Sequence, residues 1–81
     1  MNIYFLKKFR KQAKERYKLI QINRNLYYVA RMWNTDEILC SISGDLSYDD
    51  AVKKLNEIRR DFILTKVYEK RLNRGKIINN I

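Results

Sequence analysis

The sequence has no histidine and no proline, and only one cysteine and two glycines. Without histidine, the commonest general base near neutral pH is missing, and Ser–His and Cys–His nucleophilic pairs are excluded. The single Cys40 excludes an internal disulfide and, with no histidine, a structural zinc site of the usual kind. The two glycines are too far apart for a phosphate-binding loop. We therefore expect a non-enzymatic protein with no catalytic residue, cofactor or metal.

Long apolar runs are also missing, since none approaches the ~20 residues needed to span a bilayer. The N-terminus places a short apolar stretch before its charges, which is the opposite order to a secretory signal. A lone cysteine suits a reducing compartment. These features favour a cytoplasmic protein without a membrane span.

What the sequence does have is positive charge, with 18 Lys/Arg against nine Asp/Glu and a net charge of +9. Residues 1–35 hold nine bases and one acid, residues 36–50 hold five acids and no base, and residues 51–81 hold nine bases and three acids. Two basic segments therefore flank a short acidic one. Such asymmetry favours an anionic partner, although a basic protein without such a partner is the simpler alternative.

Hydrophobic periodicity predicts the order α-β-β-β-α. Residues 3–16 carry an apolar stripe at helical spacing. Residues 18–22, 26–33 and 37–43 are strand-like and are separated by short Asn-rich turns, which predicts an antiparallel meander. Ser47 can cap a second helix, which would run to about Asn73 and end at Gly75. We expect one α+β domain over residues 1–75 and a loose tail over 76–81.

The second helix would be longer than the sheet and would overhang it, because seven strand residues span only ~23 Å. Past Phe62 its apolar residues leave the original stripe, so either the helix bends or its end touches another surface. Its acidic first turn, Asp49 and Asp50, is a candidate for a hard cation together with Asp45. Helix capping explains the first two more simply.

Two groups of side chains are candidates for binding an anion. Lysines of the first helix form a ladder that could follow a phosphate backbone, or could simply be a solvated face. In the second strand, alternation places Tyr27, Val29, Arg31 and Trp33 on a face that would be open if both helices packed on the other one. Trp33 itself is more readily expected to be buried, under the first helix. The expected nucleic-acid-binding residues are Lys7, Lys8, Lys11, Lys14, Lys18, Arg24, Tyr27, Arg31 and Trp33.

The third strand is expected to bury Ile38, Cys40 and Ile42. On the overhanging part of the second helix, four residues are candidates for a protein interface. They are Ile63, Leu64, Val67 and Tyr68.

Three strands that lead into GDLSYDDAVKKLNEIRRDF resemble the ethylene-response-factor DNA-binding domain and the three-stranded N-terminal domains of tyrosine recombinases. The resemblance covers about residues 17–62. It implies that Arg31, Trp33 and Tyr27 read the DNA major groove from the sheet. The element order is also that of the double-stranded-RNA-binding domain, but the basic Lys-Lys-x-Ala-Lys helix start of that family is absent. In size and in its Lys/Asn/Ile/Tyr-rich composition, the chain is similar to accessory proteins of phages and mobile elements, including anti-CRISPR inhibitors.

Two functions follow as hypotheses. The first is a nucleic-acid-binding module, with DNA as the expected ligand. The second is a phage-type inhibitor or adaptor that docks on an acidic or nucleic-acid-handling protein. Self-association through the second helix, as a homodimer, is a third outcome.

Overall fold

The computed structural model describes residues 3–79, with side chains from Tyr4 to Leu72. The elements are α1 (Ile3–Arg16), β1 (Tyr17–Gln21), β2 (Tyr27–Met32), β3 (Ile38–Ser41) and α2 (Tyr48–Asn79). The predicted α+β class and α-β-β-β-α order are confirmed. No helix within the described residues is both long enough and apolar enough to cross a bilayer.

The three strands form an antiparallel sheet in the order β1-β2-β3. Both turns are built on an asparagine, as the sequence predicts. The side-chain oxygens of Asn23 and Asn34 each accept the backbone N–H groups two and three residues later, at 2.9–3.0 Å. This local bonding fixes each turn without a positive backbone φ angle.

The predicted start of α2 is confirmed. The Ser47 hydroxyl accepts the Asp50 N–H at 3.4 Å, and the Ser47 carbonyl accepts the Ala51 N–H at 2.9 Å. The predicted end is wrong, because α2 continues through Gly75 to Asn79. Glycine permits a helix end but does not impose one, at a helical cost of about 1 kcal/mol. Residues 80–81 of the expected loose tail lie outside the described residues, and its looseness stays a prediction.

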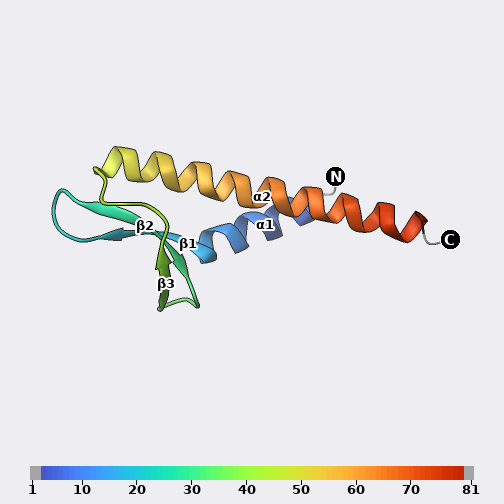
Figure 1. The fold of residues 1–81 in the computed structure, drawn as a ribbon, viewed down its shortest axis with the longest axis horizontal. Helices are drawn as coiled ribbons and strands as arrows, with labels where there is room; N and C mark the ends of the chain where they lie inside the picture. The colour runs from blue at the N-terminus through green and yellow to red at the C-terminus, as the bar shows by residue number, and fades with distance from the viewer. Residues whose placement is uncertain (1–2, 80–81) are drawn as a thin grey trace.

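Helix α2 is the spine of the molecule, at 32 residues and about 48 Å. Its N-terminal half lies over the sheet, and its C-terminal half lies beside α1 (Figure 1). The predicted overhang therefore touches another surface, which is α1. The core follows this division, with residues from both helices and from β2. Its buried apolar residues are Phe9, Ala13, Val29, Ala30, Met32, Ala51 and Leu55.

The sheet face expected to be open is covered. Tyr27 packs its ring on Tyr48 of α2, with 5.3 Å between the centroids. Val29, on the same face, is fully buried. Tyr17, the partner of Arg31 across the β1–β2 ladder, packs on Phe62 of α2 at 5.9 Å. Thus α2 covers the face that carries Tyr27 and Val29, and the prediction of an open face there is wrong.

The third strand is also corrected. Ile38, Cys40 and Ile42 were expected to be buried, but all three are exposed. The reason is geometric, since neither helix contacts β3 within the described residues. A β-bulge between Arg31 and Met32 shifts the β2–β3 register. Bulges bend a strand and increase its twist, and in Figure 1 β3 points away from α2.

Arg59 joins α2 to the point where α1 passes directly into β1. Its guanidinium donates from Nε and Nη2 to the Tyr17 carbonyl, at 3.2 and 2.7 Å. Burial lowers the pKa of Arg59, but an arginine starts so high that it stays charged in the usual pH range. The contact is therefore independent of pH.

We expect Arg59→Met to destabilise the fold by about 2 kcal/mol, since it removes two charge-assisted hydrogen bonds from a half-buried carbonyl. Urea unfolding followed by circular dichroism measures this loss. Arg60→Met is the matched control, because Arg60 is the exposed neighbour of Arg59 and its replacement removes the same charge. Equal stability of the two variants would contradict a structural role for Arg59.

Candidate nucleic-acid interface

The positive charge of the protein is concentrated in one half of the molecule. Residues 1–16 hold six Lys/Arg and one Glu, and residues 63–81 hold five Lys/Arg and one Glu. Residues 17–62, which include the sheet and the start of α2, hold seven Lys/Arg and seven Asp/Glu. We call α1 and the part of α2 from Ile63 onward the basic arm. The arm contributes the whole net charge of +9, and the rest of the chain is neutral.

The outer face of α1 carries three exposed lysines. Lys7, Lys11 and Lys14 lie on the side of the helix turned away from the buried Phe9 and Ala13. None of them forms an ion pair. Among the side chains of residues 4–72, the one ion pair within 4 Å is Lys66–Glu69, at 3.4 Å. The acidic segment 36–50 therefore does not neutralise the lysines, and they remain available to an anion.

More cations line the seam between α1 and α2. A shallow hollow of about 160 Å³ there is lined by Lys8 of α1 and by Lys66 and Lys70 of α2, with Phe5, Phe9 and Glu69. The Lys70 ammonium lies 3.8 Å from the centre of the Phe5 ring. Such cation–π contacts hold a lysine in place while leaving it charged.

Phe62 lies between the seam and the sheet, where it packs on Tyr17 of β1. The Arg16 guanidinium lies 5.2 Å and the Lys66 ammonium 5.6 Å from the centre of this ring. Arg16 is the last residue of α1. Arg16 also lines a second, larger hollow, so Phe62 lies between the seam and that second site.

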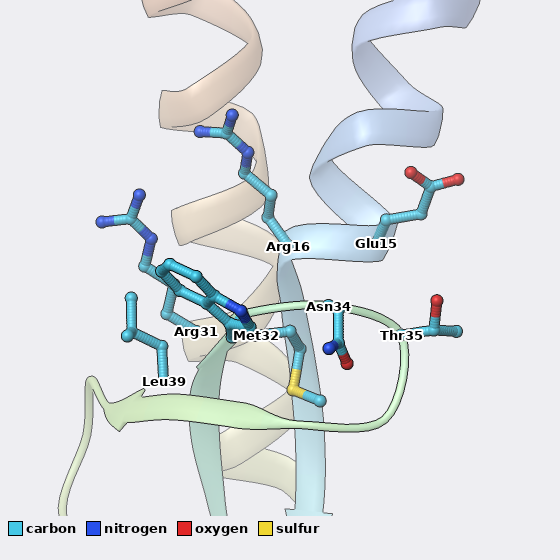
Figure 2. A pocket seen from close by; sticks show the side chains of 8 residues that line it. Glu15, Arg16, Arg31, Met32, Asn34, Thr35 and Leu39 are labelled. Carbon is cyan, nitrogen blue, oxygen red and sulfur yellow. The ribbon is translucent and has the colours of Figure 1, made fainter.

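The second site is a cleft of about 410 Å³ between the end of α1 and the β2–β3 turn. In Figure 2, the guanidinium groups of Arg16 and Arg31 lie on the same side of the cleft, while the Glu15 carboxylate points away from them. Neither arginine forms an ion pair with a described side chain. The eight lining residues are Glu15, Arg16, Arg31, Met32, Trp33, Asn34, Thr35 and Leu39.

Trp33 is 70% exposed at this cleft, so the expectation that it is buried is wrong. It follows the end of β2, where the bulge at Arg31/Met32 changes the register. The turn that carries it is firmly held. The backbone N–H of Trp33 donates to the Glu37 carbonyl at 2.8 Å, and the Lys18 ammonium donates to the Thr35 carbonyl at 3.1 Å.

The expected site residues therefore separate into groups. Lys7, Lys8, Lys11 and Lys14 lie on the arm, and Arg31 and Trp33 lie at the cleft. Lys18 leaves the predicted ladder, because α1 ends at Arg16 and its ammonium holds the second turn. Arg24 lies in the β1–β2 turn, at the other end of the sheet from α1 (Figure 1). Tyr27 is half-buried, with its ring packed on Tyr48 of α2 and away from the cleft.

Sequence reasoning missed Arg16, Lys66 and Lys70. Lys66 and Lys70 are four residues apart and therefore share a face of α2. The sequence shows that spacing. It predicts a site with Lys8 only once α2 is known to run back along α1. Arg16 was missed because it lies at the boundary between α1 and β1, where neither helical nor strand periodicity predicts which way its side chain points.

The four residues of the expected protein interface also separate. Leu64 and Tyr68 are exposed, at 58% and 62%, and Leu72 continues their row. Ile63 and Val67 are half-buried. On this part of α2, the exposed apolar side chains therefore form a narrow stripe at four-residue spacing, which consists of Leu64, Tyr68 and Leu72.

No cluster of three acidic, cysteine or histidine side chains suited to a metal ion occurs among the residues that the structure describes. No protein-family model, curated protein or solved structure matches the chain. Any functional conclusion therefore depends on the geometry of the arm and the cleft.

Trp33 is the only tryptophan of the protein, so its exposure is directly measurable. We expect the emission spectrum of a solvated indole, and quenching by acrylamide nearly as efficient in the folded protein as in urea. Blue-shifted emission with weak quenching would mean that the indole is buried and does not line an open cleft.

Proposed function

We propose that the protein binds nucleic acid without catalysing a reaction, and that the basic arm contacts the phosphate backbone. The observation that carries this proposal is the location of the entire net charge of +9 in the arm, away from the acidic segment 36–50. DNA is the ligand we expect first.

The charge arrangement suits a polyanion better than a small ligand. Cations occupy the outer face of α1, the seam and the cleft, so they extend along the arm. Each lysine or arginine that neutralises a phosphate releases a counterion, which favours binding at low salt. The molecule is 57 Å long in its longest dimension, so a strand could contact several of these cations together.

The exposed stripe on α2 favours a second candidate function. Leu64, Tyr68 and Leu72 form an apolar row on the charged arm. An amphipathic helix with such a row is a common recognition element for a groove in another protein. A partner that combines an apolar groove with an acidic rim would match both the row and its basic surroundings. This is the adaptor or inhibitor hypothesis.

The proposed contact with phosphates predicts a dependence of binding on salt concentration. Binding to a DNA oligonucleotide, measured by fluorescence anisotropy, should weaken steeply with salt. Replacement of Lys7, Lys11 and Lys14 by Gln should lower the slope of log Kobs against log salt by about three, roughly one unit for each lost phosphate contact.

The matched control is the triple replacement Lys53→Gln, Lys54→Gln and Arg60→Gln. These exposed residues lie on the part of α2 outside the arm, and their replacement removes the same three positive charges. The control should keep the wild-type slope. If both triple variants lose affinity equally, net charge alone would explain binding. If the wild type binds no nucleic acid at low salt, the proposed function is wrong.

A further prediction distinguishes the adaptor hypothesis from nucleic-acid binding. The double variant Leu64→Glu and Tyr68→Glu lowers the net charge by two. Its DNA affinity should fall only as much as that of the control double variant Thr65→Glu and Arg71→Gln, which changes the net charge by the same amount. A protein complex that survives nuclease, elutes as one species on size exclusion and is lost only in the Leu64/Tyr68 variant would favour the adaptor function. Light scattering distinguishes such a complex from a homodimer.

A further inference from the structure

We infer that the cleft between α1 and the β2–β3 turn binds an unpaired nucleotide, with its base stacked on Trp33 and its phosphate held by Arg16 and Arg31. This inference rests on the proposed function and specifies the form of nucleic acid: the preferred ligand is a single strand, or an unpaired segment, and not a continuous duplex.

The exposed indole is the first observation. A tryptophan that is 70% exposed leaves a large apolar surface in water. Its backbone is nevertheless fixed by the hydrogen bond to Glu37 and by the Asn34-based turn. An aromatic platform on a rigid support suits base stacking, because little ordering is needed on binding and every base has a stacking face. A paired base inside a duplex does not offer that face.

The two arginines are the second observation. Arg16 is held over Phe62, and Arg31 lies in β2 beside the register shift, opposite Cys40 of β3. Their guanidinium groups lie on one side of the cleft without a carboxylate partner (Figure 2). A guanidinium binds phosphate oxygens through two parallel N–H donors. Unpaired arginines beside an exposed aromatic ring therefore provide the two groups that a nucleotide requires.

The cleft also has the right size and one additional donor. Its volume of about 410 Å³ lies within the usual range for small-ligand sites, about 300–1,000 Å³. The Asn34 side-chain oxygen is already occupied by two backbone N–H groups. Its NH₂ group is left to donate to a base or a sugar.

The seam explains why the ligand is a strand and not a free nucleotide. The Phe62 ring contacts both Arg16 and Lys66. Lys66 also lines the seam hollow, together with Lys8 and Lys70. A strand whose base occupies the cleft would find these cations for its neighbouring phosphates. A mononucleotide would leave them unused.

The test compares four ligands: a short oligothymidylate, the same backbone without bases, a duplex of equal length and thymidine monophosphate. Isothermal titration calorimetry measures each affinity, because variants at Trp33 contain no tryptophan, and quenching of Trp33 fluorescence is followed in the wild type. The oligothymidylate should quench Trp33 and bind most tightly. Trp33→Ala should weaken its binding roughly 5- to 150-fold, the range expected for one lost base–aromatic stack. Binding of the abasic backbone should be unchanged by this substitution.

Two further variants complete the design. Trp33→Phe should retain most of the affinity, since a smaller ring can still stack. Arg16→Gln with Arg31→Gln should weaken the oligothymidylate and the abasic backbone alike, and Arg24→Gln with Lys53→Gln is the equal-charge control outside the cleft. Trp33 and both arginines are exposed, so their replacement removes no buried core residue. Urea unfolding of each variant measures any loss of stability from the Arg16–Phe62 contact.

The outcomes separate the inference from the proposed function. If oligothymidylate binds without quenching Trp33 and Trp33→Ala has no effect, while replacement of Lys7, Lys11 and Lys14 weakens binding, the cleft inference is wrong and the arm proposal stands. Tighter binding of the duplex, or equal binding of the mononucleotide, would also overturn the inference. If no nucleic acid binds, both are wrong.

Discussion

The structure depends on how α2 holds the junction between α1 and β1. No loop joins these two elements, so Arg16 ends the helix and Tyr17 begins the strand. At this point, Phe62 of α2 contacts the Tyr17 ring and the Arg16 guanidinium, while Arg59 hydrogen-bonds to the Tyr17 carbonyl. These contacts fix α1 against one end of α2 and the sheet against the other. They also place Arg16, and so connect the stability of the junction to the proposed binding site.

Crowding of like charges on the arm has an energetic consequence. Eleven Lys/Arg and two Glu are assigned to it, and within the described side chains only Lys66 has a carboxylate partner. Such self-repulsion opposes the packing of α1 on α2. The aromatic rings of Phe5 and Phe62 offset part of it, since their faces attract Lys70, Lys66 and Arg16. An anion bound along the arm would relieve the remainder, so binding and folding of the arm favour each other.

The sequence was sufficient for the elements and insufficient for their packing. Local signals decide the elements: the stripe in residues 3–16, the Asn-rich turns and the Ser47 cap all act within a few residues. The covered face of the sheet was predicted wrongly because alternation distinguishes two faces without saying which one a helix covers. An arginine on a face was read as a sign of exposure. In the structure, Arg31 is exposed at the strand end while Val29, two residues earlier, is fully buried under α2.

The candidate site was harder to predict for a similar reason. The α1 lysines follow from helical spacing alone. The cleft, however, requires the β-bulge at Arg31/Met32, the lack of helix contact with β3 and the return of α2 along α1. None of these is a property of a short segment. Trp33 shows the limit most clearly, since the general preference of tryptophan for burial favoured the core and the local bulge placed it in solvent.

The size of the chain makes an exposed site of this kind reasonable. A protein of 81 residues buries a limited fraction of its surface and has little interior to spare for a deep pocket. Binding groups must then lie on the surface and be fixed by elements that already exist. Here the end of α1 supplies Arg16, the strand β2 supplies Arg31 and a turn held by Asn34 and Lys18 supplies Trp33. Because backbone structure positions all three, the cleft needs no additional core to hold its geometry, and the binding that we propose there would depend on charge and stacking and not on enclosure.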